Sequence, residues 1–284
     1  MDASLHPDAI ARLLVSGLAL SGCLHAHLWR DTSAAAGLSE AQRSSWFPAS
    51  PLCGLSWTLA GEGEQIDTQG RPQPLPGPCL ITGPRSRPAQ YRSRGGMRCF
   101  MSAITPDALH ALTGLDPAAL TDRTLTMAQA GLPADWLALN RPMLAAADEQ
   151  ECQRLLEDFL RPRWQTRQGL AGAGYRGWMQ NLSLRAVAGG HGRSLRQIER
   201  RIKQWSGQSL RALRMISRAE ATFLQVRREM ADGELVWSAL ALDMGYADQA
   251  HLCRETRRVT GFSPEELRRR VDSEESFWAY RVWV

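Results

Sequence analysis

Apolar positions recur along the chain with two different periods. Over residues 13–30, 52–67 and 97–104, short apolar and aromatic runs alternate with polar residues. This alternation favours β-strands. Residues 70–88 contain six prolines, which predict turns there except for a short apolar piece at Leu80 and Ile81. The first part of the chain therefore reads as strand-rich.

From Thr105 onward the pattern favours helices. Thr105 followed by Pro106 is typical of a helix start, and the spacing predicts helices over 105–112 and 149–161. Residues 169–174 are rich in glycine, so we place a linker there. After the linker every predicted element is a helix: 175–182, 184–188, 194–205, 211–230, 236–244, 249–260 and a short one from Ser263.

The stretch 194–207 returns 54 residues later in altered form. Gly207 falls on Gly261, and Ser209 falls on Ser263. A repeat at a fixed offset indicates two copies of one supersecondary unit. In the first copy one helical face is apolar, because Leu195, Ile198, Ile202 and Trp205 recur at helical spacing, while the remaining face is mainly basic.

Length and charge narrow the class of protein. A chain of 284 residues with 44% hydrophobic residues is long enough for two globular domains. Residues 170–284 hold 19 Lys and Arg against 13 Asp and Glu, so this part carries the basic excess and suits a polyanionic partner. Lys203 is the only lysine. Arginine suits bidentate contacts to phosphate or guanine, although GC-rich coding bias would give the same composition.

Cysteine spacing and targeting signals favour the cytoplasm. The six cysteines lie far apart without a CxxC pair, as expected of free thiols in a reducing compartment. No apolar run approaches the roughly 20 residues that span a bilayer. The stretch LLVSGLALSGC at 13–23 is similar to a lipoprotein signal, but Asp2 and Asp8 outweigh Arg12 before it. A structural strand or helix is therefore favoured over export.

Two glycine turns, each followed by a helix with a basic face, match the helix-turn-helix plan, whose second helix enters the major groove. The segments SLRQIERRIKQWSGQS and GYADQAHLCRETRRVTGFSPEELR, joined by one long helix, resemble the DNA-binding domain of the AraC/XylS family of bacterial transcription regulators. The resemblance covers about residues 175–270, with departures at the core positions Thr256 and Leu267. LITGPRSRP and LTGLDPAALTDR are similar to a sensor domain attached to some AraC-type regulators.

Both outer helices are expected to contact duplex DNA. Arg196, Arg200 and Arg254 are better explained as phosphate or base contacts than as solvated charges. Glu199 either accepts from cytosine or pairs with Lys203 one turn later. For His251, a DNA contact and a plain surface position are equally supported. The predicted DNA-binding set is Ser194, Arg196, Gln197, Glu199, Arg200, Lys203, Gln249, Ala250, His251, Arg254 and Arg258.

No residue pattern predicts chemistry, a metal or a cofactor. His25 and His27, two apart on a strand, would share a face as metal ligands do. No suitably spaced acidic residue follows them, so we favour a structural role. No Ser/His/Asp or Cys/His arrangement suggests nucleophilic catalysis. The aromatic tail at 277–283 is expected to pack back on the protein, with a partner surface as the alternative.

The sequence thus predicts an α+β chain in three parts. Residues 1–168 form a strand-rich sensor or dimerisation domain with helices, for which a cupin-like fold is one form; 169–174 are the linker; 175–284 form an all-α domain with two helix-turn-helix units and the aromatic tail. We expect a cytoplasmic, sequence-specific DNA-binding transcription regulator, not an enzyme, that reads adjacent major-groove segments. The resemblance implies response to an unknown small effector and contact with RNA polymerase.

Three questions stay open at this point. A homodimer is compatible with the pattern, and the sign of regulation, activator or repressor, is not encoded in any motif. The alternative function is a ligand-binding or enzymatic N-terminal domain that uses the DNA-binding half only as a tether. A catalytic constellation in residues 1–168 would support that alternative.

Overall fold

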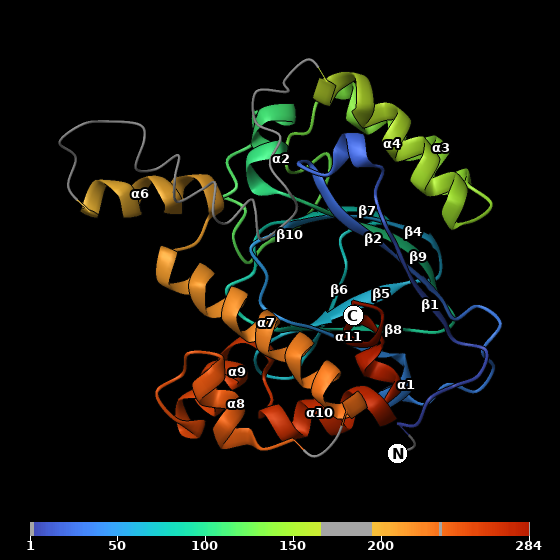
Figure 1. Ribbon diagram of the computed structural model, residues 1–284. Helices are drawn as coiled ribbons and strands as arrows, with labels where there is room; N and C mark the ends of the chain where they lie inside the picture. The colour runs from blue at the N-terminus through green and yellow to red at the C-terminus, as the bar shows by residue number, and fades with distance from the viewer. Residues whose placement is uncertain (1–2, 166–194, 233–234, 284) are drawn as a thin grey trace.

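The computed structural model describes residues 3–165, 195–232 and 235–283 (Figure 1). The expected linker at 169–174, the helices expected at 175–182 and 184–188, and Ser194 lie outside the described residues. We call residues 3–165 the sheet domain and the described residues from 195 onward the helical half. A strand-rich part followed by a helical part confirms the predicted fold class.

The sheet domain contains two antiparallel sheets. The larger has the strand order β1-β2-β9-β4-β7-β10 and the smaller the order β3-β8-β5-β6. The strands of the larger sheet are β1 (Ile10–Leu14), β2 (Leu24–Asp31), β9 (Arg98–Ile104), β4 (Cys53–Ala60), β7 (Cys79–Thr82) and β10 (Thr124–Thr126). Those of the smaller are β3 (Ser44–Phe47), β8 (Ala89–Ser93), β5 (Gly63–Ile66) and β6 (Pro72–Pro74).

The strand β6 lies in the stretch for which turns were expected. Its two prolines have no N–H to donate, which confines such a strand to the edge of a sheet. β6 is the last strand of the smaller sheet and pairs only with β5 in the described structure. The short apolar piece at Leu80 and Ile81 forms β7, as predicted.

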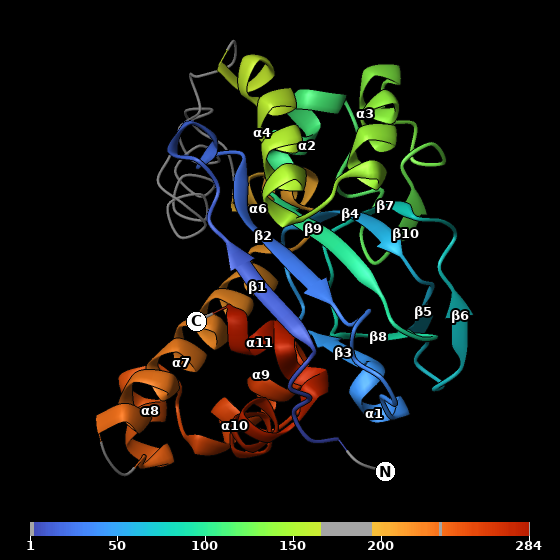
Figure 2. The same ribbon diagram turned by 90° about the vertical axis from the view of Figure 1, so that its right-hand side faces the viewer.

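Helices cover one face of the larger sheet, as Figure 2 shows for α2 (Pro106–Thr113), α3 (Ala134–Ala145) and α4 (Glu149–Gln165). Their apolar sides and the sheet enclose a core that includes Trp57, Phe100, Trp136 and Trp164. α3 was not predicted, and α4 runs past the expected end at residue 161. Short helical turns stand at η1 (Leu18–Leu20) and α1 (Glu40–Arg43).

The helical half follows the predicted order closely. α7 (Leu210–Asp232) joins α6 (Leu195–Ser206) to a second unit made of α8 (Trp237–Asp243) and α9 (Gln249–Thr260). α10 (Pro264–Ser273), η2 (Glu275–Phe277) and α11 (Trp278–Val282) end the chain. In Figure 1 α6 stands apart from α8 and α9, with α7 running between them. None of the described helices is long and apolar enough to cross a membrane.

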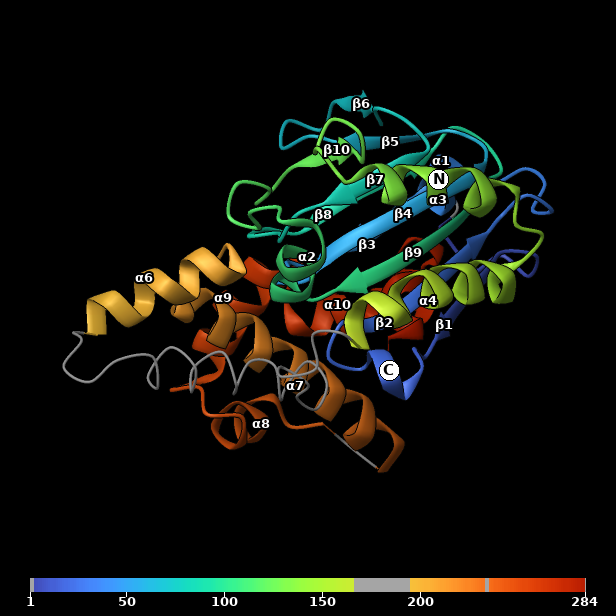
Figure 3. The same ribbon diagram turned by 90° about the horizontal axis from the view of Figure 1, so that it is seen from above.

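Apolar side chains of the sheet domain pack against apolar side chains of the helical half. Leu52 packs with Ile202 and Leu213, and Ala49 lies in a cluster with Ile216 on α7. In the view from above, α6, α7 and α8 stand to one side of the sheets (Figure 3). The two parts therefore meet through apolar side chains rather than through a solvated gap.

The aromatic tail packs back on the protein, as expected. Phe277 and Trp278 are fully or almost fully buried, and Trp278 contributes to a cluster that contains Leu28 of β2. Trp278 Nε1 also donates to Ser45 Oγ at 2.8 Å. The end of the chain is thus part of the contact between the sheet domain and the helical half.

Candidate nucleic-acid interface

The two outer helices, α6 and α9, end in the same hydrogen-bonded cap. Ser206 Oγ donates to the carbonyl oxygen four residues earlier at 2.7 Å, and Thr260 Oγ1 makes the same bond at 2.8 Å. Each hydroxyl oxygen also accepts from the N–H two residues later, at 3.3 Å and 3.2 Å. Gly207 and Gly261 have φ of 72° and 90°, the left-handed conformation that favours glycine. The repeat seen in the sequence therefore extends to individual hydrogen bonds.

The second unit has a turn and a small core of its own. Gly245, with φ of 75°, ends α8, and the Asp248 carboxylate caps α9 by accepting from His251 N–H at 2.6 Å. Tyr246 between them is buried with Ala241 and Leu252 in one cluster. These contacts fix α9 against α8 in the manner of a helix-turn-helix unit.

The predicted DNA-binding residues of α6 lie on its exposed face. Arg196, Gln197, Glu199, Arg200 and Lys203 are all exposed, whereas Ile202 is fully buried. Within the described part of the chain, none of the three cations forms an ion pair, and Glu199 does not pair with Lys203. The basic face of α6 is therefore available to an anionic partner.

The predicted residues of α9 divide into two groups. Gln249, Ala250, Arg254 and Arg258 are exposed. His251 is engaged within the protein instead: its Nε2 lies 3.2 Å from a Glu255 oxygen, and its Nδ1 accepts from Ala247 N–H at 3.3 Å. These contacts favour a role for His251 in holding the turn.

One exposed cation on α9 is absent from the predicted set. Arg257 is exposed, and the repeat places it at the position of Lys203 in α6. Applying the 54-residue offset to every predicted residue of the first helix would have added it.

A cavity of about 310 Å³ lies between the sheets and the helical half, and α9 is the outer helix that contributes to its lining. Its lining comes from both sheets and from α7, α9 and α11. On β4, Ser56 and Thr58 line it, while Trp57 between them faces the core under α3. Ile216 and Phe223 of α7 line it from the helical half. Most of these side chains are apolar, which suits a small organic ligand.

Arg85 places a buried charge in the wall of this mostly apolar cavity. Its side chain is buried, and Nη2 donates to the hydroxyl of Tyr91 and to Thr124 Oγ1, the latter at 3.0 Å. Among the described residues no carboxylate forms an ion pair with it. Burial lowers the pKa of Arg85 to about 10, and the charge of Asp122 opposes this shift. The group stays cationic at neutral pH, so an acidic or hydrogen-bond-accepting ligand group would suit it.

Two hydroxyl groups in the cavity lining have no hydrogen-bond partner among the described residues. They are Ser102 Oγ and the Tyr280 hydroxyl. Burial raises the pKa of Tyr280, so its hydroxyl stays protonated and can donate. Buried polar groups are normally satisfied, so both hydroxyls favour a polar group in the occupant of the cavity.

The expectation that His25 and His27 share a strand face is wrong. The register of β2 against β9 shifts between Leu24 and Ala26, so that His25 is the extra residue of a β-bulge. The His25 ring packs at a tilt against Trp283 of the tail, with ring centroids 5.1 Å apart. His27 lies on the opposite face of the sheet, and the two rings cannot bind one metal ion.

His27 is buried in the sheet domain and faces α4. Its ring stacks on Phe100 at 5.3 Å, and its Nε2 lies 3.4 Å from Glu157 Oε1. Burial lowers the pKa of His27, and the Glu157 carboxylate opposes this shift. In the part of the chain that the structure describes, no group of three or more potential metal ligands converges.

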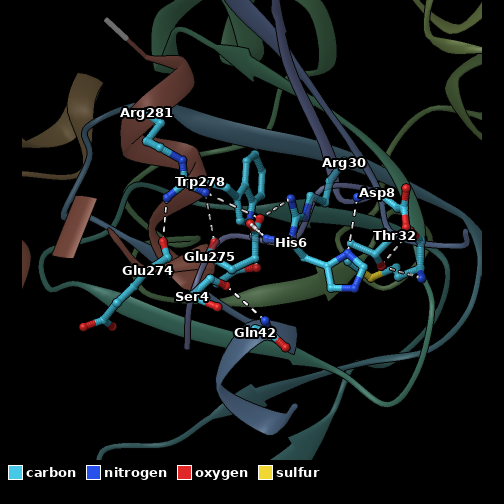
Figure 4. Close-up of polar contacts among 12 residues, drawn as sticks. Ser4, His6, Asp8, Arg30, Thr32, Gln42, Glu274, Glu275, Trp278 and Arg281 are labelled. Carbon is cyan, nitrogen blue, oxygen red and sulfur yellow. Dashed lines mark hydrogen bonds and ion pairs between the residues drawn. The ribbon is translucent and has the colours of Figure 1, made fainter. Parts of the chain in front are cut away.

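The tail is fastened to the sheet domain by a buried ion pair (Figure 4). Arg30 Nη1 lies 2.8 Å from Glu275 Oε1, and both side chains are less than 5% exposed. The Arg30 guanidinium also lies over the Trp278 ring, 5.2 Å from its centroid. Removing one partner of such a pair leaves a buried charge, which is costly, so this contact holds the end of the helical half in place.

Comparison with known families identifies the helical half. Residues 187–270 match the family described as a helix-turn-helix domain. The chain therefore carries a helix-turn-helix domain in the region where the sequence resemblance placed one. No curated protein matches the chain.

Two of the solved structures that match the chain are remote from it in sequence. An apo variant of ToxT from Vibrio cholerae is 9% identical and has a TM-score of 0.38, with 94% of this chain and 98% of that chain covered. ToxT with a bound unsaturated fatty acid is also 9% identical, with a TM-score of 0.37 and coverage of 94% and 96%.

Proposed function

We propose that this chain, which carries an AraC-type helix-turn-helix domain, is a sequence-specific transcription regulator that a small effector controls. The observation that carries the proposal is the pair of identically capped helices, α6 and α9, each with exposed arginines. Arginine forks fit guanine edges and phosphates. In this proposal residues 1–168 are the sensor domain, 169–174 the linker and 175–284 the DNA-binding domain.

The proposed DNA contacts come from both units. α7 has 23 residues, so at roughly 1.5 Å per residue it spans about 34 Å, close to one turn of B-DNA. One chain would thus place both outer helices in successive major-groove segments and read two short, dissimilar elements. The proposed contact residues are Ser194, Arg196, Gln197, Glu199, Arg200 and Lys203 in the first unit, and Gln249, Ala250, Arg254, Arg257 and Arg258 in the second, with His251 positioning the turn.

The proposed effector is a small, largely apolar molecule with one acidic or hydrogen-bond-accepting group. The cavity supports this class because its lining is mostly apolar and contains the buried guanidinium of Arg85, which forms no ion pair with the residues that the structure describes. A volume of about 310 Å³ lies at the small end of ligand pockets. The lining includes residues of both parts of the chain, so an occupant would touch the helical half as well as the sheets.

The remaining features of the proposal follow from the family resemblance. We propose that the protein acts in the cytoplasm, binds duplex DNA, contacts RNA polymerase and catalyses no reaction. A homodimer is compatible with the proposal, because each of its two copies would bind its own DNA site. The alternative stays a ligand-binding or enzymatic N-terminal domain that uses the DNA-binding half only as a tether.

Selection of bound sites from random duplexes with the full chain tests the function. We expect two short elements about one turn apart, and an affinity that falls steeply as salt rises, because phosphate neutralisation releases counterions. Arg141→Ala, an exposed arginine on α3, is the matched control and should bind as wild type does. A folded protein that enriches no site, or whose binding ignores salt, would refute the proposal.

A further inference from the structure

Two short segments of the sheet domain meet the helical half where the outer helices end. Ser50 N–H donates to Arg85 O at 3.0 Å, and Arg85 N–H donates to Ser50 O at 2.7 Å. We call residues 48–50 together with 84–88 the bracket. Ser86 N–H donates to the Asp122 carboxylate at 2.7 Å, which ties the bracket to the loop before β10. The bracket is thus one hydrogen-bonded piece.

The first unit is attached to the bracket just after α6. Gln208, only 3% exposed, donates from Nε2 to Ser50 O at 3.1 Å and to Arg85 O at 2.9 Å. The preceding Gly207 is close as well, since a Cβ there would lie 3.2 Å from Pro84 Cγ. The end of α6 therefore contacts both segments of the bracket directly.

The second unit meets the bracket at the corresponding place. Ala49 N–H donates to Val259 O, in the last turn of α9, at 2.7 Å. A Cβ on Gly261 would lie 3.6 Å from Pro88 Cγ, in ordinary contact. Gly207 and Gly261 are equivalent in the repeat, so one rigid piece of the sheet domain touches equivalent ends of both outer helices.

The same bracket also reaches the cavity. The backbone oxygen of Arg85 holds Gln208, while its guanidinium lies in the cavity wall on Tyr91 and Thr124. A ligand that binds this guanidinium would displace Arg85, and its backbone oxygen accepts the hydrogen bond from Gln208 just after α6. Ala49 and Ser50 line the cavity too, so the link is not confined to one side chain.

We propose that the bracket sets the spacing at which the two outer helices meet DNA, and that a ligand in the cavity changes this spacing through Arg85. This inference rests on the proposed function as a reader of two DNA elements. When two binding modules are held rigidly, the second binds at a high effective concentration, but only at the spacing that the geometry allows. A loosened bracket lowers that effective concentration and widens the range of accepted spacings.

The test measures binding of the full chain to the selected site and to versions with one base pair added or removed between the two elements. Gln208→Leu keeps the size of the side chain and removes both hydrogen bonds to the bracket. We expect it to reduce the preference for the native spacing on the order of tenfold. Gln225→Leu is the matched control and should keep the wild-type preference, because Gln225 Nε2 donates to Glu229 within α7 and not to the bracket.

Arg85→Met tests the link from the cavity side without touching the outer helices. We expect it to change the spacing preference as well, and to add nothing further in combination with Gln208→Leu. Equal spacing preference in wild type and in both folded single variants overturns the proposal, as does a uniform loss of affinity at every spacing. Failure of the wild-type chain to bind any duplex refutes the proposed function instead. If Gln208→Leu does not fold, Arg85→Met alone decides by the same measurement.

Discussion

The two helix-turn-helix units share one cap geometry and differ in how they attach to the sheet domain. The residue after the cap glycine is Gln208 in the first unit and Phe262 in the second. Gln208 forms hydrogen bonds to the carbonyl oxygens of Ser50 and Arg85. Phe262 packs edge-on against Trp46, with ring centroids 5.0 Å apart. The same repeat position therefore makes a polar contact in one unit and an apolar contact in the other.

The outward faces of the two units serve the proposed reading of DNA, whereas their attachments to the sheet domain serve its proposed control by the effector. The outward faces of α6 and α9 are alike in carrying exposed arginines, so both units suit the proposed reading of DNA. Hydrogen bonds are directional and modest in net energy, whereas a buried aromatic side chain contributes several kcal/mol without strict orientation. At this repeat position the first unit is thus held by contacts that a small shift of the bracket would break, and the second by a contact that tolerates such a shift.

The largest expected effect comes from the apolar attachment. Phe262→Ala removes a side chain that is 8% exposed and packs with Trp46, Phe277 and Leu267. We expect the free energy of unfolding to fall by about 3–5 kcal/mol, measured by urea denaturation. Leu242→Ala, at a residue of the second unit that is 64% exposed, should change it by less than about 0.5 kcal/mol. A loss below about 1 kcal/mol for Phe262→Ala would remove the distinction between the two attachments.

Patterns in the sequence correctly predicted those helices and strands whose bounds are set by residues next to them in the chain. α9 begins and ends where the sequence placed it, because Asp248 and Gly261 are local cap signals. The bulge at His25 could not be predicted in this way, since it depends on the register between β2 and β9. Edge strand β6 was missed because its prolines indicate turns unless the neighbouring strand is known.

The candidate site was predictable only in its outer part. The exposed arginines follow from helical periodicity and from the repeat, both of which are local. The cavity is lined by residues of both sheets and of α7, α9 and α11. No spacing in the sequence predicts that these residues lie close together. The role of Arg85 depends on Tyr91 and on two partners that are distant in sequence, Thr124 and Gln208. Such a residue is visible only once the chain is folded.

A smaller effect is expected at the two base-reading positions. Arg200→Ala should relax base preference in one DNA element, and Arg254→Ala in the other, each costing about 1–3 kcal/mol of binding free energy if the contact is bidentate to guanine. Repeated site selection with each variant measures the preference. An arginine whose loss weakens binding to all sequences equally holds phosphate instead. Changes at the same base pairs in both variants would contradict the separate reading of two elements.

The smallest effect is expected at the equivalent cations Lys203 and Arg257. Both are exposed on the outer helices, and the repeat places them at the same position. If both hold phosphate, Lys203→Ala and Arg257→Ala should each leave base preference unchanged and lower the slope of log affinity against log salt concentration by about one. Titrations of the selected site at several salt concentrations measure this slope.

The comparison of these two variants shows whether both units bind DNA at the same time. Equal changes in slope mean that α6 and α9 contact the phosphate backbone in the same way, as their common cap geometry implies. A change for Arg257→Ala without one for Lys203→Ala would mean that only the second unit is bound. In that case the bracket does not hold α6 in a DNA-binding position in the free protein, and an occupant of the cavity would have to bring it there.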